Sequence, residues 1–309
     1  MKKTVSYSFC FFVLLVFSSK TFATDGAFPV LKGNWFGQEE PGLVPEIFAP
    51  GLISLEGRYE FCVSFSPDLK EMYFTVLDVI DGKQGKPAIF YSKVENQKWT
   101  RPQKANFTKS VMSYELLPHV SLSGDRIYFS AGVEEGSKKS GVWYVVRNED
   151  DWSKARKLDL PLSLGRVSDF NQGPHGDIFL TKMSEKKMYH SESKNDDISD
   201  IKALDIEFGV HGFIAPEGDY LLVNARVTAE DRNDNDLFVM FKEEDNSWSK
   251  PINLGASVNS HYSETVARVT PDGKFLFFGR YSEPGRLSNI YWVSTKLISQ
   301  LKETYFNRK

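Results

Sequence analysis

Short clusters of hydrophobic residues recur along the chain, each directly after a group of turn-forming residues. Five nine-residue stretches align without gaps: SPDLKEMYF (66–74), SLSGDRIYF (121–129), GPHGDIFLT (173–181), APEGDYLLV (215–223) and TPDGKFLFF (270–278). Pro, Gly and Asp supply the turn, and the apolar and aromatic residues that follow favour strands. The copies recur roughly every 50 residues, a period typical of repeat folds built from small sheets.

A second aromatic strand follows each copy: AIFYSKV, GVWYVVR, KKMYHSE, DLFVMFK and NIYWVST. Three of these are followed by a Trp and then Ser or Thr, at Trp99, Trp152 and Trp248, and Ile198 takes the Trp position in a fourth. One unit is therefore four short strands joined by turns. Strands at this period, with almost no helical periodicity, predict an all-β fold made of propeller blades.

The last unit ends at NIYWVSTKLISQLK without a Trp-type fourth strand, whereas PEIFAPGLISLEGRYE precedes the first unit and has the pattern of a displaced one. Pairing an N-terminal strand with C-terminal strands removes the exposed edge of a ring of sheets. We therefore predict a five-bladed β-propeller over residues 45–298, in which residues 45–54 complete the last blade. Residues 24–44 form an N-terminal lead-in, and residues 299–309 form a tail with a short helix over ISQLKETYF.

The segment WSKPINLGASVNSHYSETVARVTPDGKFLFF (248–278) resembles the PD40 repeats, also called WD40-like or TolB-like, of bacterial envelope proteins. It has their Trp-Ser-x-Pro, Asn-Leu-Gly, Val-Asn-Ser, Glu and Pro-Asp-Gly elements. The resemblance covers about residues 45–298 and implies a propeller, a fold found in binding modules, scaffolds and some enzymes. The third repeat lacks both the Glu and the Pro-Asp, and the fourth has Glu217 in place of Asp, so specificity is expected to have diverged there.

The first residues have the order of a secretory signal peptide: two lysines, a short apolar run, and small residues ending at Ala23. We predict cleavage after residue 23 and a periplasmic or secreted protein. Cys62 is then the one cysteine left, so no disulfide forms within the chain. The formal charge of −3, with Lys and Arg spread along the sequence, argues against a nucleic-acid partner. No later segment is apolar enough to be predicted as a membrane span.

Glutamates occupy the position six residues before the turn in three repeats, at Glu60, Glu115 and Glu264, whereas Val167 and Gly209 occupy it in the others. Two of these glutamates lie sixteen residues after a tryptophan, Trp99 or Trp248. Equivalent positions surround a propeller axis, so the carboxylates could share one end of the channel and act as acid and base. The alternative is that each glutamate binds backbone amides in its own blade, because functional residues usually break repeat symmetry.

Residues that differ between repeats also fall near the expected axis. Four residues before the turns stand Cys62, Leu117, Asp169, His211 and Val266, and two before stand Ser64, His119, Asn171, Phe213 and Arg268. Because side chains alternate along a strand, His119, Asp169, His211 and Arg268 could meet near the propeller axis, the region that we call the hub. His119, Asp169 and His211 suit a divalent metal, and Arg268 suits an anionic group. The alternative is a polar, water-filled channel that binds no ligand or cofactor.

Two further motifs have simpler interpretations. Cys62 could act as a nucleophile beside His211, although a buried cysteine is more often an unreactive core residue. The stretch AEDRNDNDLF (229–238) resembles a calcium-binding loop but has Asp236 where such a loop needs glycine, which favours a solvated hairpin turn. Phosphate-binding glycine loops, GxSxG, HExxH, CxxC and sialidase-type Asp boxes are absent from the sequence.

The sequence thus predicts an exported propeller that binds an envelope protein, a peptide or a glycan at the channel mouth, with no nucleic-acid partner and no membrane span. The candidate ligand-binding residues are Glu60, Glu115, His119, Asp169, His211, Glu264 and Arg268. The alternative is a carbohydrate-active hydrolase or lyase that uses carboxylates or a His-bound metal at the same mouth. Two glutamates facing one open pocket would favour the enzyme, and glutamates bound to their own blades would favour the binding module. A flat aromatic face would favour a platform for partner proteins.

Overall fold

The computed structural model describes residues 31–80, 83–133, 140–149, 151–161, 167–191, 198, 201–204, 209–226, 235–282 and 287–308. The predicted signal peptide (1–23) and most of the calcium-like stretch (229–234) lie outside these described residues. Within them, no helix has the length and apolar character needed to cross a membrane.

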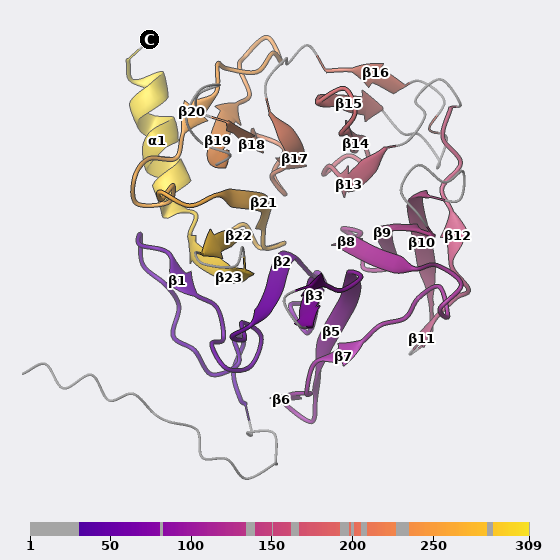
Figure 1. Ribbon diagram of the computed structural model, residues 1–309. Coiled ribbons are helices and arrows are strands. Elements are labelled where there is room, and N and C mark those ends of the chain that lie inside the picture. Colours follow the sequence, from indigo (N-terminus) through magenta and orange to yellow (C-terminus); the bar gives the residue numbers. More distant parts are fainter. Residues whose placement is uncertain are drawn as a thin grey trace, which may run out of the picture.

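Strands account for most of the described chain, and one helix, α1 (Lys296–Phe306), follows the last strand (Figure 1). The strands are β1 (Glu46–Ile47), β2 (Arg58–Phe65), β3 (Glu71–Ile80), β4 (Lys83–Gln84), β5 (Ala88–Glu95), β6 (Lys98–Trp99), β7 (Gln103–Lys104), β8 (Tyr114–Val120), β9 (Arg126–Gly132), β10 (Gly141–Asn148), β11 (Asp151–Trp152), β12 (Arg156–Lys157), β13 (Ser168–Gln172), β14 (Ile178–Lys182), β15 (Lys187–Ser191), β16 (Ile201–Ala203), β17 (Val210–Ile214), β18 (Tyr220–Arg226), β19 (Asn235–Phe241), β20 (Ile252–Asn253), β21 (Glu264–Val269), β22 (Phe275–Ser282) and β23 (Leu287–Ser294). Each predicted turn is followed by a strand, so the hydrophobic pattern gave the elements correctly.

The strands form antiparallel sheets whose order follows the chain. Three sheets have the orders β11-β10-β9-β8, β13-β14-β15-β16 and β17-β18-β19-β20. The strand groups β21-β22-β23 and β2-β3-β5-β6 are connected into one larger sheet by a parallel contact between Tyr59 and Ser288. The sheets stand around a common centre, with β2, β8, β13, β17 and β21 nearest to it (Figure 1). This arrangement brings the first-strand residues of distant repeats together.

The N-terminal segment closes the ring as the sequence predicts. Strand β1 pairs antiparallel with β23, with Glu46 opposite Trp292 and Ile47 opposite Tyr291. Directly after it, the amide of Phe48 donates a hydrogen bond of 2.8 Å to the carbonyl of Ile290. The free edge of β23 is therefore covered by residues more than 200 positions earlier in the chain, which satisfies its backbone groups.

The expected lead-in contributes to the hydrophobic core. Trp35 and Phe36 are each 4% exposed. The Trp35 ring meets Phe65 of β2 edge-on at 5.6 Å, and Phe36 stacks on Trp99 at 4.4 Å. The indole nitrogen of Trp99 donates a 3.0 Å hydrogen bond to the carbonyl of Gly33. This segment therefore fastens the first and last strand groups of the larger sheet, β2-β3-β5-β6 and β21-β22-β23, to each other through aromatic packing.

One backbone irregularity recurs in the strands nearest the centre. The pairing register shifts in β2, β8, β13, β17 and β21. In each strand the residue at the shift has a positive φ of 51° to 57°: Cys62, Leu117, Asp169, His211 and Val266. Residues other than glycine seldom take this conformation, and its recurrence marks a repeated β-bulge. A bulge re-aims the side chain, and these side chains meet one another across the sheets.

Candidate functional site

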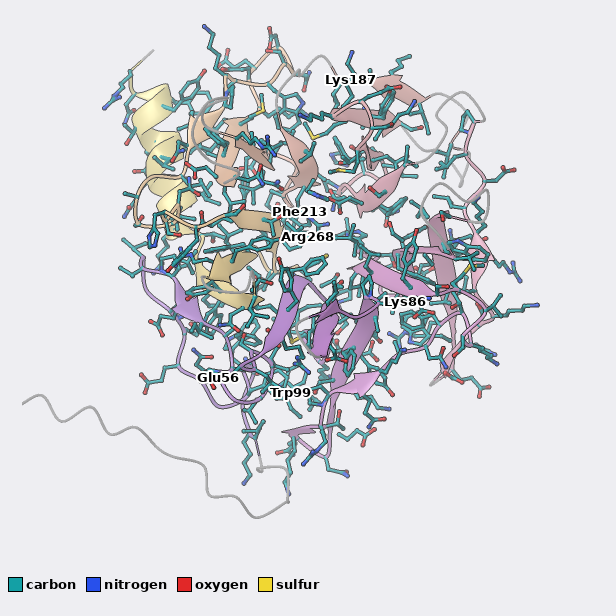
Figure 2. All side chains as sticks on the ribbon, in the orientation of Figure 1. Glu56, Lys86, Trp99, Lys187, Phe213 and Arg268 are labelled. Carbon is teal, nitrogen blue, oxygen red and sulfur yellow. The ribbon has the colours of Figure 1, made fainter. Side chains whose placement is uncertain are left out.

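The polar half of the hub is an ion-paired cluster of three side chains from three strands. Arg268 of β21 donates through Nη2 to Oδ1 of Asp169 on β13. Oδ2 of the same carboxylate lies 2.8 Å from Nδ1 of His211 on β17. Figure 2 shows Arg268 and its neighbour Phe213 at the centre of the ring of sheets. Of the four side chains expected to meet near the axis, Asp169 contacts His211 and Arg268, whereas His119 makes its hydrogen bond elsewhere.

Burial and mutual attraction act in opposite directions on this cluster. Burial alone would raise the pKa of Asp169, but Arg268 and His211 outweigh it and hold that pKa below its usual value. Burial likewise opposes the charge of Arg268, whereas the attraction of Asp169 raises the Arg268 pKa above its ordinary value. The Arg268 guanidinium also lies 5.3 Å from the centre of the Phe213 ring. Both groups therefore remain charged although they are buried.

The other half of the hub is apolar. Cys62, Leu117 and Val266 form one buried cluster, with Phe61 and Leu116 packed against it. Burial raises the pKa of the Cys62 thiol to about 12, so the thiol is protonated at neutral pH. His211, the base proposed for a Cys62 nucleophile, is bound to Asp169 instead. Cys62 is thus a core residue, the simpler of the two interpretations.

His119 lies near the end of β8, close to the turn that follows this strand. Its Nε2 accepts a 3.1 Å hydrogen bond from the amide of Gln172. Burial, and then the charge of Arg268, lower the His119 pKa to about 3, so the imidazole is neutral. His119 and Arg268 line a small cavity of about 30 Å³ with Ser64 and Phe213. That volume suits one or two water molecules and is too small for a larger ligand.

The candidate metal ligands do not form a metal site. Both oxygens of Asp169 are engaged, one by Arg268 and the other by His211. The accepting nitrogen of His119 is used by the Gln172 amide. In the part of the chain that the structure describes, no three side chains of His, Cys, Asp or Glu gather as metal ligands. The interactions among these hub side chains are therefore ion pairs and hydrogen bonds.

Glu115 and Glu264 bind the loops that lead into their own strands. The Glu115 carboxylate accepts the amides of Phe107 and Thr108 at 3.1 and 2.7 Å. The Glu264 carboxylate accepts the amide and hydroxyl of Ser260 at 3.2 and 2.6 Å. Both glutamates are buried. These contacts agree with the backbone-binding alternative, in which the repeated glutamate fixes the corner of each sheet.

Glu60 makes the same kind of contact, and it resembles Glu264 in also pairing with an arginine, Arg58 for Glu60 and Arg280 for Glu264. Its Oε1 accepts hydrogen bonds from the Leu55 amide at 3.2 Å and from Nε of Arg58 at 2.6 Å. Its Oε2 is buried without a hydrogen-bond partner among the described residues. Burial raises the Glu60 pKa to about 7, and Arg58 only partly offsets this. No hydrogen bond or ion pair in the described chain links Glu60, or the other two glutamates, to the hub cluster.

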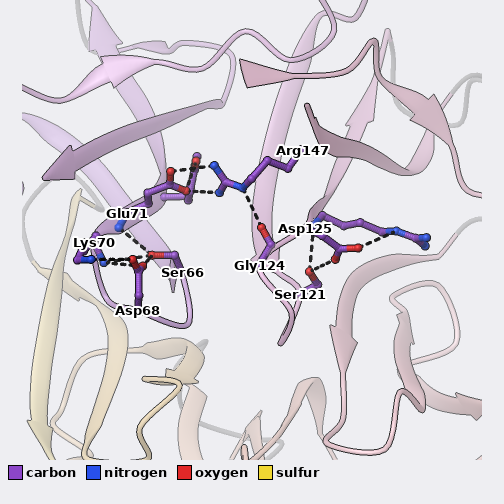
Figure 3. A network of polar contacts seen from close by, with 10 residues as sticks. Ser66, Asp68, Lys70, Glu71, Ser121, Gly124, Asp125 and Arg147 are labelled. Atoms are coloured by element: carbon purple, nitrogen blue, oxygen red, sulfur yellow. Dashed lines mark hydrogen bonds and ion pairs between the residues drawn. The ribbon is translucent and has the colours of Figure 1, made fainter. Parts of the chain in front are cut away.

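A cleft that the sequence pattern did not predict lies between the strands β3 and β5 of the first repeat and the sheet of the second repeat, and we call it the inter-sheet cleft. It has a volume of about 180 Å³, and its lining includes Glu71, Tyr73, Tyr91, Lys93, Phe107, Lys109, Arg147, Asp151 and Trp152. Arg147 binds both oxygens of Glu71 at 3.1 and 2.5 Å and crosses from one sheet to the other (Figure 3).

Comparisons with known proteins bear on the fold. No protein-family profile and no curated protein sequence matches this chain. The chain is similar to an α-L-arabinofuranosidase from Podospora anserina solved with cellotriose, at a TM-score of 0.52 and 10% identity, covering 82% of this chain and 98% of that one. It is also similar to a GH62 hydrolase solved with xylotriose, at 0.50 and 10%, covering 84% and 99%. At this identity the likeness shows a β-propeller fold and nothing finer.

Proposed function

We propose that this protein is an exported β-propeller of five blades that binds a carbohydrate at the hub mouth where His211 lies. The blade number is supported by the bulge that recurs in β2, β8, β13, β17 and β21, each the first strand of one sequence repeat. The parallel contact between Tyr59 and Ser288 then joins two neighbouring blades, and β1 completes the last one. Membership of the PD40 group is part of the same proposal and rests on the repeat motifs.

The contact between Asp169 and His211 is the observation that carries the binding proposal. Asp169 holds Nδ1 of the imidazole, so Nε2 is left to face away from the carboxylate. The His211 side chain is 16% exposed, whereas Asp169 is fully buried and Arg268 is 3% exposed. His211 is therefore the member of the cluster that a ligand can reach. The two similar hydrolases were solved with cellotriose and xylotriose, which makes neutral oligosaccharides the first class to test.

A thermal-shift titration tests this proposal. We expect cellotriose, xylotriose or an arabino-oligosaccharide to raise the melting temperature of the mature protein, because a ligand that binds the folded state stabilises it by mass action. His211→Ala should remove the shift, and His261→Ala, at an exposed histidine elsewhere, should leave it intact. Absence of a shift with all three sugars, or an equal shift in the His211 variant, would refute carbohydrate binding at this mouth.

Hydrolysis at the same mouth is the second candidate, and the Asp169–His211 geometry favours it. An imidazole oriented by a buried carboxylate can take a proton from water through Nε2, as histidine does in hydrolases. The glutamates do not support a carboxylate-pair mechanism, because Glu60, Glu115 and Glu264 are each bound within their own loops. Release of shorter sugars by the wild type but not by His211→Gln, which keeps Asp169 paired with Arg268, would establish the enzyme. Sugar binding without release of any shorter sugar would favour a binding module over an enzyme.

Export is supported by the order of residues at positions 1–23. Fractionation of the native host, with sequencing of the mature N-terminus, tests it. We expect the protein outside the cytoplasm with Thr24, or a residue within a few positions of it, at its start. An intact N-terminus in the cytoplasm would refute export.

A further inference from the structure

The inter-sheet cleft has a counterpart elsewhere in the ring, and the chain itself fills that counterpart. In the repeat alignment, Glu71 and Tyr73 correspond to Phe275 and Phe277, and Tyr91 corresponds to Trp292. Between the last and first sheets, the ring of Trp35 lies on all three corresponding residues. Its centre is 5.1 Å from Phe275, 6.3 Å from Phe277 and 5.5 Å from Trp292. An aromatic side chain from the N-terminal segment thus occupies that groove.

A second counterpart is filled by the C-terminal helix. The positions of Tyr73, Tyr91 and Lys93 correspond to Leu222, Val239 and Phe241 in the fourth repeat. These residues belong to one core cluster with Leu297 and Ile298 of α1. Leu301 and Tyr305 of the helix pack against the same cluster, and the Tyr305 ring lies 5.8 Å from Phe241. Both ends of the described chain therefore cover grooves of the same type with hydrophobic side chains.

The groove between the first and second sheets is different, because the described residues leave about 180 Å³ of it open. A cavity of about 150 Å³ is enough to hold a benzene molecule, so this one accommodates an aromatic side chain. Tyr91 and Trp152, both half-buried, form its walls. Trp152 is already flanked by the Arg147 guanidinium at 4.3 Å, a contact that fixes the Trp152 ring in place.

The rim of the inter-sheet cleft carries more positive than negative charge. Lys93, Lys109 and Arg147 oppose Glu71 and Asp151, which leaves an excess of one positive charge. Glu71 and Arg147 neutralise each other as a bidentate pair that joins the two sheets (Figure 3). Lys93 is 39% exposed in its side chain and also meets Glu95 at 2.8 Å. An occupant that carries carboxylates next to its aromatic group would complement this rim.

We propose that the inter-sheet cleft docks an aromatic side chain of an acidic peptide segment of a partner protein. The chain's own N-terminal segment is the precedent, because Trp35 and Phe36 are followed by Glu39 and Glu40. The partner segment places its aromatic ring between Tyr91 and Trp152, and its carboxylates face the two lysines. This site is separate from the hub mouth and does not depend on carbohydrate binding there.

Fluorescence anisotropy with a defined probe tests the proposal. The probe is a fluorescein-labelled peptide with the sequence of residues 31–42, LKGNWFGQEEPG, added to the full mature protein. We expect saturable binding that weakens on the order of 30-fold when the peptide Trp is replaced by Ala, the loss typical of an aromatic anchor. Reversal of both rim charges, Lys93→Glu with Lys109→Glu, should weaken binding roughly tenfold.

Lys98→Glu is the matched control, because Lys98 is exposed and does not line the cleft. It should leave the affinity unchanged. An equal loss in the control and in the double variant would mean non-specific charge attraction and would refute the site. If the peptide still binds the double variant, it has displaced the protein's own Trp35 segment from its groove. That result would also refute the inter-sheet cleft as the binding site. No saturation, or displacement of the peptide by xylotriose, would overturn the proposal as well.

Discussion

Asp169 and Arg268 are separated by 99 positions in the chain and form an ion pair buried at the hub. Their strands, β13 and β21, belong to different sheets, so the pair ties distant repeats together. A buried ion pair adds little net stability over an apolar replacement, but removal of one partner leaves an uncompensated charge. The stability of the folded hub therefore depends on the presence of both residues.

We expect Arg268→Met to destabilise the fold by about 3–5 kcal/mol, because Asp169 would then be buried with only His211 beside it. The double variant Asp169→Asn with Arg268→Met should recover much of that loss. Urea unfolding monitored by tryptophan fluorescence measures both. Additive losses in the double variant would show that the two residues are not energetically coupled.

Glu60 should make stability fall as pH rises. Its folded pKa of about 7 exceeds the ordinary value of 4.5, so between these values the folded state binds more protons than the unfolded state. The neutral form is favoured by folding, and the free energy of unfolding should decrease by about 3 kcal/mol from pH 4.5 to pH 7 through this group alone. Glu60→Gln, which is neutral at every pH, should reduce this dependence without abolishing it, because burial also raises the pKa of Glu264, and should be more stable than wild type at pH 8.

Glu115→Gln is the control for that experiment. Both Glu115 oxygens accept backbone amides, so an NH₂ group in place of one oxygen would face an amide donor. We expect a loss of about 1–3 kcal/mol at acidic and alkaline pH alike. Chemical denaturation at pH 5 and pH 8 compares the two variants, and a similar response of both would refute the assignment of the pH dependence to Glu60.

Trp35 should matter for stability far more than its position in an N-terminal lead-in suggests. Its ring contacts Phe65, Phe275 and Trp292, and 4% of the residue is exposed. We expect Trp35→Ala to cost about 3–5 kcal/mol, the usual range for a buried tryptophan. Val44→Ala, in the same segment but 67% exposed, should cost less than about 0.5 kcal/mol. Thermal unfolding of the two variants provides the comparison.

Cys62 should be unreactive until the protein unfolds. It is 1% exposed, and burial raises its pKa to about 12, so neither access nor the thiolate form is available. We expect no labelling of Cys62 by a thiol-specific reagent at pH 8 in buffer, and full labelling above the urea midpoint. Mass spectrometry of the Cys62 peptide measures this. Rapid labelling of the folded protein would contradict the apolar packing of Cys62 with Leu117 and Val266.

The sequence by itself determined the local structure of this protein. Pro-Asp-Gly turns and alternating aromatic residues specify strands through short-range preferences, so the repeat gave the strand positions, the pairing of β1 with β23 and the C-terminal helix. Offsets of four residues before the turn for Asp169 and His211, and of two for Arg268, also identified these residues as neighbours, because equivalent positions in repeats face one axis.

Tertiary structure alone decided how those side chains are used. The bulges at Cys62 and its counterparts interrupt the alternation of side chains, so the glutamates bind their own loops and do not share the hub with Asp169. Burial and partner charges then set which groups ionise, as in the opposite pKa shifts of Glu60 and Asp169. The inter-sheet cleft exists because no described segment fills it, whereas Trp35 and α1 fill its counterparts. Such packing between distant segments depends on the whole folded chain and leaves no local pattern in the sequence.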